Sequence, residues 1–286
     1  MKERIQYIVV MILMLLSVNV DAQALTDGRK GQEAVAREVI DRFTGGQMPV
    51  KVVIDLQPGA NGCDQYRYSA DRKRLTIHAS SAVAACRAFY DYAKEKRAGI
   101  RTWSARRFER PDDISCKDRA CTTLFRDHQY FNVVTYGYTM PFWNEARWDE
   151  EIDWMALHGI DMPLMLVGAE GIYREVFRDM GLTDSEIDDW EVGPAHLPWF
   201  RMGNLSGNSF DGPLGKDWND SQVELCKHVI GRMRKLGMKP ICPAFGGFVP
   251  KTFVDHYEGE IDYNVDDVMQ TCWDMGIYTL DAGVDN

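Results

Sequence analysis

The feature that most constrains this chain is an alternation of short apolar runs with amphipathic segments between Tyr130 and Pro250. The apolar runs have the length and composition of buried strands, and the amphipathic segments repeat their apolar residues at helical spacing. The predicted strands are Phe131–Tyr136, Asp161–Val167 and Met238–Phe245, and the predicted helices are Arg147–His158 and one that begins at Asn219. This alternation implies a parallel sheet with helical crossovers, so we predict the opening units of a TIM-type (β/α) barrel.

The segment Gly168–Trp218 follows the second predicted strand and is far longer than a plain connection. In such barrels the functional residues collect at this end of the strands. Aromatic and polar residues stand here among glycines and prolines: Trp199, Arg201, Asn204, Asp211 and Trp218. An aromatic platform with polar neighbours suits a sugar. Thr183 and Glu186 have the spacing of a capping box, which predicts that the segment is ordered.

Residues 23–125 predict a small α/β domain ahead of the barrel, which would occupy residues 126–286. The predicted elements are a helix at Gly31–Phe43, strands at Val50–Leu56, Tyr66–Tyr68 and Leu75–His78, and a helix from Ser80 or Ser81 to Lys94. The polar segment Arg107–Lys117 is predicted to be the linker. The fold class is therefore α/β, with a small N-terminal α/β domain followed by an incomplete barrel.

Residues 1–22 have the pattern of a secretory signal. Lys2 and Arg4 precede the apolar run Ile8–Leu16, and Ala22 offers a cleavage position. The run is short for a membrane-spanning helix, although an uncleaved anchor is the alternative. We expect an exported protein, periplasmic or secreted, without stable membrane insertion after cleavage.

Charge and cysteine content exclude several classes of function. The formal net charge of −10 disfavours a nucleic-acid partner. Seven cysteines in an exported chain allow disulfides, and Cys116 with Cys121 is a candidate pair. The sequence has no HExxH motif, zinc spacing, phosphate-binding loop or dinucleotide fingerprint. We therefore expect no metal and no cofactor.

Several blocks of sequence carry a family resemblance. They include Asn132-Val133, Trp143 with Ala146-Arg147-Trp148, EIDWMALHGI, GPAHLPWFRMGNL, DGPL and PAFGGFVP. Over residues 30–253 these blocks resemble glycoside hydrolase family 89, the α-N-acetylglucosaminidases. From about residue 254 the sequence departs from the family pattern.

The resemblance implies retaining hydrolysis by two glutamates, with terminal α-linked N-acetylglucosamine of glycosaminoglycan or mucin-type glycans as the substrate. It implies substrate-binding roles for Asn132, Val134 and Trp199. From the residues alone, Asn132 could equally brace the backbone, and Val134 would share its strand face. No catalytic residue is assigned within the chain, because the family glutamates are expected beyond Asn286.

Two readings of the function stay open. Glu170 lies in the barrel-mouth region and could be a reacting carboxyl group, or it could pair at the start of the helix Gly171–Met180. The resemblance does not place a catalytic glutamate there. The alternative to an active enzyme is a truncated, inactive family member that at most binds glycan weakly.

Overall fold

The computed structural model describes residues 28–242, 248–256 and 278–279, and they fall into two compact units. The first unit contains residues 28–126 with Ala156–Gly159 and Arg234–Met238. The second contains Asp127–Met155, Ile160–Met233 and the described residues from Lys239 onward. The expected signal segment and most of the divergent tail lie outside the described residues.

The first unit is built on a four-stranded sheet with the order β1-β3-β2-β6. β1 and β3 are parallel, whereas β2 pairs antiparallel with both β3 and β6. The bounds are β1 Val50–Ile54, β2 Gln65–Ala70, β3 Leu75–Ala79 and β6 Cys116–Thr122, with a short 3-10 turn η1 at Ala60–Gly62. Alternate residues of β1 and β3 are buried, as expected for strands that turn one face to a core.

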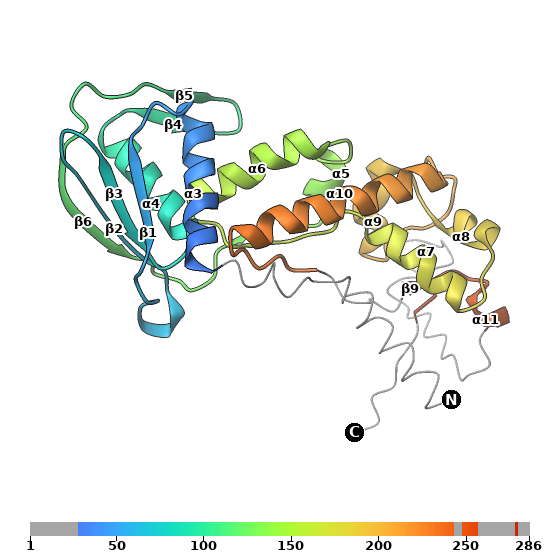
Figure 1. Ribbon diagram of the computed structural model, residues 1–286. Coiled ribbons are helices and arrows are strands. Elements are labelled where there is room, and N and C mark those ends of the chain that lie inside the picture. The colour runs from blue at the N-terminus through green and yellow to red at the C-terminus, as the bar shows by residue number, and fades with distance from the viewer. Residues whose placement is uncertain (1–27, 243–247, 257–277, 280–286) are drawn as a thin grey trace. The chain divides into compact units, whose positions relative to one another are not determined.

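Helices α3 (Arg29–Thr44) and α4 (Ala82–Glu95) pack against each other and against this sheet, as Figure 1 shows. Ser81 caps α4 by accepting a hydrogen bond from the backbone N–H of Ala84, which decides between the two predicted caps. The prediction of a linker at Arg107–Lys117 is wrong. Its ends lie in β5 (Arg106–Phe108), which pairs with β4 (Gly99–Arg101), and in β6. β6 is an exposed edge strand, and its polar composition lacks the apolar pattern from which strands are predicted.

The second unit contains parallel strand segments that follow one another in chain order. β7 (Gln129–Tyr130) pairs parallel with β8 (Met162–Pro163), and Leu164 forms a parallel bridge with Ile241. The predicted parallel order is confirmed, but the lengths predicted for the first two strands are wrong. The third predicted strand, Met238–Phe245, lies partly outside the described residues. Phe131 has a φ of 71°, so the first strand ends before it. A turn and the start of α5 (Thr135–Tyr138) occupy the rest of the expected strand.

The two long helices agree with the predicted apolar stripes. α6 spans Glu145–His158 and buries Trp148, Ile152 and Met155 completely. α10 spans Lys216–Lys235 and begins three residues before the expected Asn219; it buries Leu225, Val229 and Met233. Gly159, with a φ of 76°, follows the end of α6.

The long excursion has a core of its own. It contains α7 (Ala169–Asp179), α8 (Asp184–Trp190), the 3-10 turn η2 (Pro194–His196) and α9 (Leu197–Arg201). Their apolar residues pack with β9 (Phe248–Val249) and α11 (Phe253–His256), and the cluster includes Phe177, Trp190, Val192, Phe200 and Phe253. β9 also pairs antiparallel with β10 (Tyr278–Thr279). The capping box at Thr183 and Glu186 is present, so the predicted order is confirmed.

The predicted pairing of Cys116 with Cys121 is wrong, because both thiols are free and both residues lie on β6.

Within residues 28–242, 248–256 and 278–279, no helix has the length and apolarity needed to cross a membrane. No cluster of His, Cys, Asp and Glu suited to a metal ion occurs in that same part of the chain.

Candidate functional site

Asn132 stands in the turn that leads from β7 to α5. Its side-chain carbonyl oxygen accepts hydrogen bonds from the backbone N–H and the hydroxyl group of Thr135, at 3.0 and 2.9 Å. The side chain therefore braces the backbone, one of the two roles that the sequence left open. Its NH₂ group has no protein partner in the described structure, and the residue is exposed. That group is free to donate to a ligand.

Val134 directly precedes α5 and has helical backbone angles, with φ −68° and ψ −35°. The expectation that it shares a strand face with Asn132 is wrong, because these residues belong to a turn. Its side chain is half-buried. It can offer only apolar contact to anything bound beside the turn.

Trp199 lies in the middle of α9. Successive residues of a helix are rotated by about 100°, so the residues beside Trp199 point away from its own direction. Leu197 and Phe200 enter the excursion core, and Phe200 stacks edge-on against Trp190 at 4.4 Å between ring centroids. Trp199 is only half-buried. Its indole is the large apolar group that α9 leaves partly open.

α5 and α9 are in contact, and glycine makes the contact possible. A Cβ atom at Gly137 of α5 would overlap the ring of Pro198 and lie 3.0 Å from the carbonyl oxygen of Ala195. The absence of a side chain at Gly137 thus lets α5 lie against α9. The structure brings the segment that follows Asn132 and Val134 against the helix that carries Trp199.

Glu170 is engaged in an ion pair rather than free. Its carboxylate accepts two hydrogen bonds from the Arg201 guanidinium, 2.6 Å from Nε and 2.9 Å from Nη2. Both side chains are buried. Burial opposes the charge on Arg201, but the Glu170 carboxylate outweighs it and raises the pKa of the guanidinium. The pairing role considered for Glu170 is confirmed, and Arg201 is its partner.

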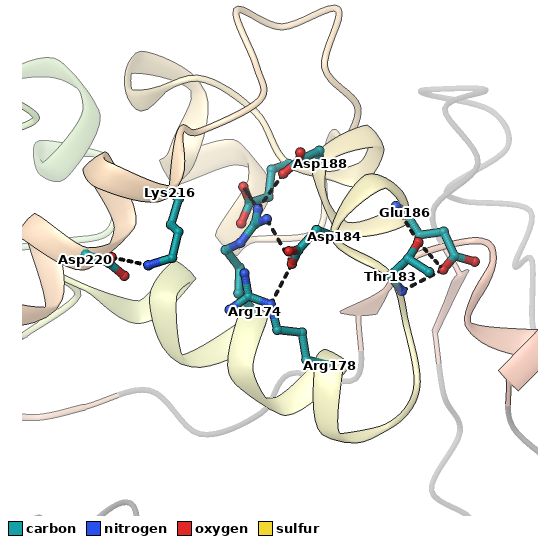
Figure 2. Close-up of polar contacts among 9 residues, drawn as sticks. Arg174, Arg178, Thr183, Asp184, Glu186, Asp188, Lys216 and Asp220 are labelled. Atoms are coloured by element: carbon teal, nitrogen blue, oxygen red, sulfur yellow. Dashed lines mark hydrogen bonds and ion pairs between the residues drawn. The ribbon is translucent and has the colours of Figure 1, made fainter.

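A second buried guanidinium joins α7 to the end of α8 (Figure 2). Arg174 Nη1 lies 2.7 Å from an oxygen of Asp188 and 2.7 Å from one of Glu191. Nearby, Arg178 Nε contacts Asp184 at 2.6 Å. Burial raises the pKa of Glu191 to about 7, against the attraction of Arg174. Because of this burial, Glu191 retains its proton more easily than a solvated glutamate.

Every buried carboxylate in the described part of the chain has a partner. The pairs are Glu151 with Arg147, Asp153 with Arg232, Asp161 with the backbone N–H of His128, Glu170 with Arg201, and Glu191 with Arg174. Glycoside hydrolysis uses one carboxyl group as acid and another as base or nucleophile. None of these groups is free for such a role.

The remaining polar residues of the excursion are structural or exposed. Asp211 has a φ of 58°, and its side chain is 82% exposed beside His196. The backbone N–H of Asn204 bonds the Trp199 carbonyl, and Trp218 packs edge-on against Phe142. Sequence reasoning missed Tyr136, whose hydroxyl bonds the Leu164 carbonyl at 2.5 Å. The sequence pattern places Tyr136 in a strand and gives no sign that its ring lies beneath Arg201.

A sheet-and-helix first unit, followed by parallel strands with helical crossovers, defines a (β/α)-barrel protein with an N-terminal α/β domain. The sequence model of the alpha-N-acetylglucosaminidase (NAGLU) TIM-barrel domain matches residues 128–276, and that of the NAGLU N-terminal domain matches residues 34–114. The chain therefore belongs to the α-N-acetylglucosaminidase family, glycoside hydrolase family 89.

Individual relatives agree with this assignment. Human alpha-N-acetylglucosaminidase is 38% identical over 231 residues, which are 78% of this chain and 31% of the human protein. A family 89 glycoside hydrolase from Clostridium perfringens, solved with 2-acetamido-1,2-dideoxynojirmycin, is 26% identical with a TM-score of 0.74. The match covers 83% of this chain and 27% of that one.

A further Clostridium perfringens structure holds a substrate. That protein carries two Glu-to-Gln substitutions and is bound to its substrate, GlcNAc-alpha-1,4-galactose; it is 25% identical to this chain with a TM-score of 0.74. The chain spans 31% of the human relative and 27% of the bacterial ones.

Proposed function

We propose that this chain supplies the first domain and the opening barrel units of an exported α-N-acetylglucosaminidase. Its substrate would be terminal α-linked N-acetylglucosamine on glycosaminoglycan or mucin-type glycans. The observation that carries the proposal is the packing of α9 on α5, with Pro198 against Gly137. This contact joins the turn of Asn132 and Val134 to the helix of Trp199, in a chain whose relatives include a protein bound to GlcNAc-alpha-1,4-galactose.

Each of the three residues has a distinct chemical role in this proposal. The Asn132 NH₂ group donates a hydrogen bond to the sugar, because the carbonyl oxygen of that amide is occupied by Thr135. The Trp199 indole stacks on an apolar face of the sugar ring. Val134 contributes apolar contact beside the turn. These residues hold the ring, and they move no proton.

The bond-breaking groups in the proposal are two glutamates outside the described part of the chain. One protonates the leaving oxygen, and the other attacks the anomeric carbon to give retention of configuration. The buried carboxylates described above support this assignment, because each is already bonded to a donor within the fold.

The test of the binding role is Trp199→Ala, introduced at the equivalent position of a catalytically complete relative. Loss of the stacking surface is expected to cost about 1–3 kcal/mol and to raise KM for an aryl α-N-acetylglucosaminide by about 5- to 150-fold. Trp103→Ala is the matched control, because Trp103 is 59% exposed and lies in the first unit. Equal kinetics for the two variants would contradict the role of Trp199.

A second candidate is an inactive protein that binds glycan weakly. The complete pairing of buried carboxylates in the described structure favours it for the 286-residue chain taken alone. The two candidates share the same sugar-binding residues and differ only in turnover. A direct assay of hydrolysis separates them.

A further inference from the structure

We infer that the buried pair Arg201–Glu170 is a positioning device that holds the Trp199 helix against α5. The inference rests on the proposed function, since it explains how the proposed sugar-binding residues are kept in register. Neither charged residue is assigned contact with sugar. Both act through Trp199 and through the segment that follows Asn132.

The short length of α9 creates the need for such a device. A helix of five residues is far below the length at which a helix is stable in water, so tertiary contacts must fix it. Leu197 and Phe200 anchor one side in the excursion core, and Pro198 rests on Gly137. Those contacts are apolar, and the hydrophobic effect has no direction of its own, so a hydrogen-bonded contact adds an orientation that burial alone does not supply.

Arg201 supplies the directional contact. Its Nε and Nη2 atoms both bond Glu170, in the first turn of α7, at 2.6 and 2.9 Å. A two-point bond between planar groups fixes orientation as well as distance. Because Trp199 and Arg201 are two residues apart on the same short helix, fixing one side chain fixes the direction of the other.

The same guanidinium also reaches α5. Its central carbon lies 5.8 Å from the centre of the Tyr136 ring, within the range of a cation–π contact. Tyr136 follows the Asn132 turn, is buried, and bonds the Leu164 carbonyl. Arg201 therefore links α5, α7 and α9, which carry or adjoin every proposed sugar-binding residue.

The chain contains a matched comparison in the pair Arg174–Glu191. Side-chain exposures are 8% and 4% for Arg201 and Glu170, and 5% and 2% for Arg174 and Glu191. Both pairs lie in the second unit. Arg174, however, joins α7 to the end of α8 and has Asp188 as a further partner. Loss of either guanidinium leaves a buried carboxylate, but of the two arginines only Arg201 belongs to the Trp199 helix.

The experiment uses the full chain labelled with 5-fluorotryptophan and read by ¹⁹F NMR, with the Trp199 signal assigned from Trp199→Phe. The variants are Arg201→Met, the doubly neutral Glu170→Gln/Arg201→Met, Arg201→Lys, and Arg174→Met as the control. The ligand probe is methyl N-acetyl-α-glucosaminide. The doubly neutral variant guards against unfolding, because it leaves no unpaired buried charge.

We expect the Trp199 signal to shift or broaden in both variants that carry Arg201→Met and to stay in place in Arg174→Met. Affinity for the probe is expected to fall at least about 10-fold with Arg201→Met and to recover partly with Arg201→Lys. A Trp199 signal that is the same in the folded doubly neutral variant as in the wild type would overturn the inference. A wild-type signal that does not respond to the probe would instead contradict the proposed function, while the effect of Arg201 stays readable.

Discussion

At the scale of single residues, the amide of Asn132 has two roles: its oxygen braces the turn, and its NH₂ group is proposed to bind the ligand. We predict that Asn132→Ser keeps an oxygen that can brace the turn but loses the NH₂ donor. Affinity for an α-N-acetylglucosaminide is expected to fall by about 0.5–1.5 kcal/mol, the worth of one neutral hydrogen bond. Titration calorimetry with the same probe sugar measures this change.

Asn132→Ala is the companion variant, because it removes both functions of the amide. It is expected to lose the same binding energy and, in addition, about 1 kcal/mol of stability from the unbraced turn. Thermal unfolding of the two variants separates these effects. Equal affinity for Asn132→Ser and the wild type would show that the amide serves the backbone alone.

At the scale of elements, the junction of α7 with α8 is predicted to respond to pH through Glu191. The pKa of this buried carboxyl rises from 4.5 to about 7, so between these values the folded state binds more protons than the unfolded state. The free energy of unfolding is therefore expected to fall as pH rises from about 4.5 to about 7. The contribution of Glu191 to that fall is on the order of 3 kcal/mol.

Glu191→Gln provides the control, since an amide does not titrate and is close in shape to the protonated carboxyl. Urea unfolding of both proteins at pH 5 and pH 8 measures the difference in slope, which removes the contribution of other titrating groups. The variant is expected to lose less stability than the wild type over this range. Parallel pH dependences would mean that Arg174 holds Glu191 ionised throughout.

The elements that the sequence predicts well are those whose signal is periodic or local. The stripe of Trp148, Ile152 and Met155 predicts α6, and the spacing of Thr183 and Glu186 predicts the cap of α8. Strand lengths were predicted poorly, because an apolar run does not reveal where the backbone turns. Phe131 adopts a left-handed backbone conformation that the neighbouring sequence does not predict.

At the scale of the whole molecule, the parallel order of the barrel segments follows from alternation alone, whereas the site depends on distant partners. Glu170 and Arg201 are separated by 31 positions, and their bond reflects the path of the intervening chain. Tyr136 and Gly137 matter through contacts with elements that follow them much later. No periodicity encodes such contacts, so the sequence predicts the residue types of the site better than its geometry.

The last prediction concerns the turnover of the chain as a whole. We expect the 286-residue chain to bind an α-N-acetylglucosaminide without hydrolysing a chromogenic one, because the described buried carboxylates are bonded to guanidinium or backbone donors. Protonating a leaving group requires a carboxyl oxygen within hydrogen-bond reach of the ligand, and both oxygens of Glu170 are bonded to Arg201. The release of chromophore, measured over a range of protein concentrations, shows whether the chain hydrolyses this substrate. If Glu170→Gln or Glu191→Gln abolishes turnover, that residue is the acid, and the inactive candidate is rejected. If turnover survives both substitutions, the acting carboxylates lie elsewhere in the chain.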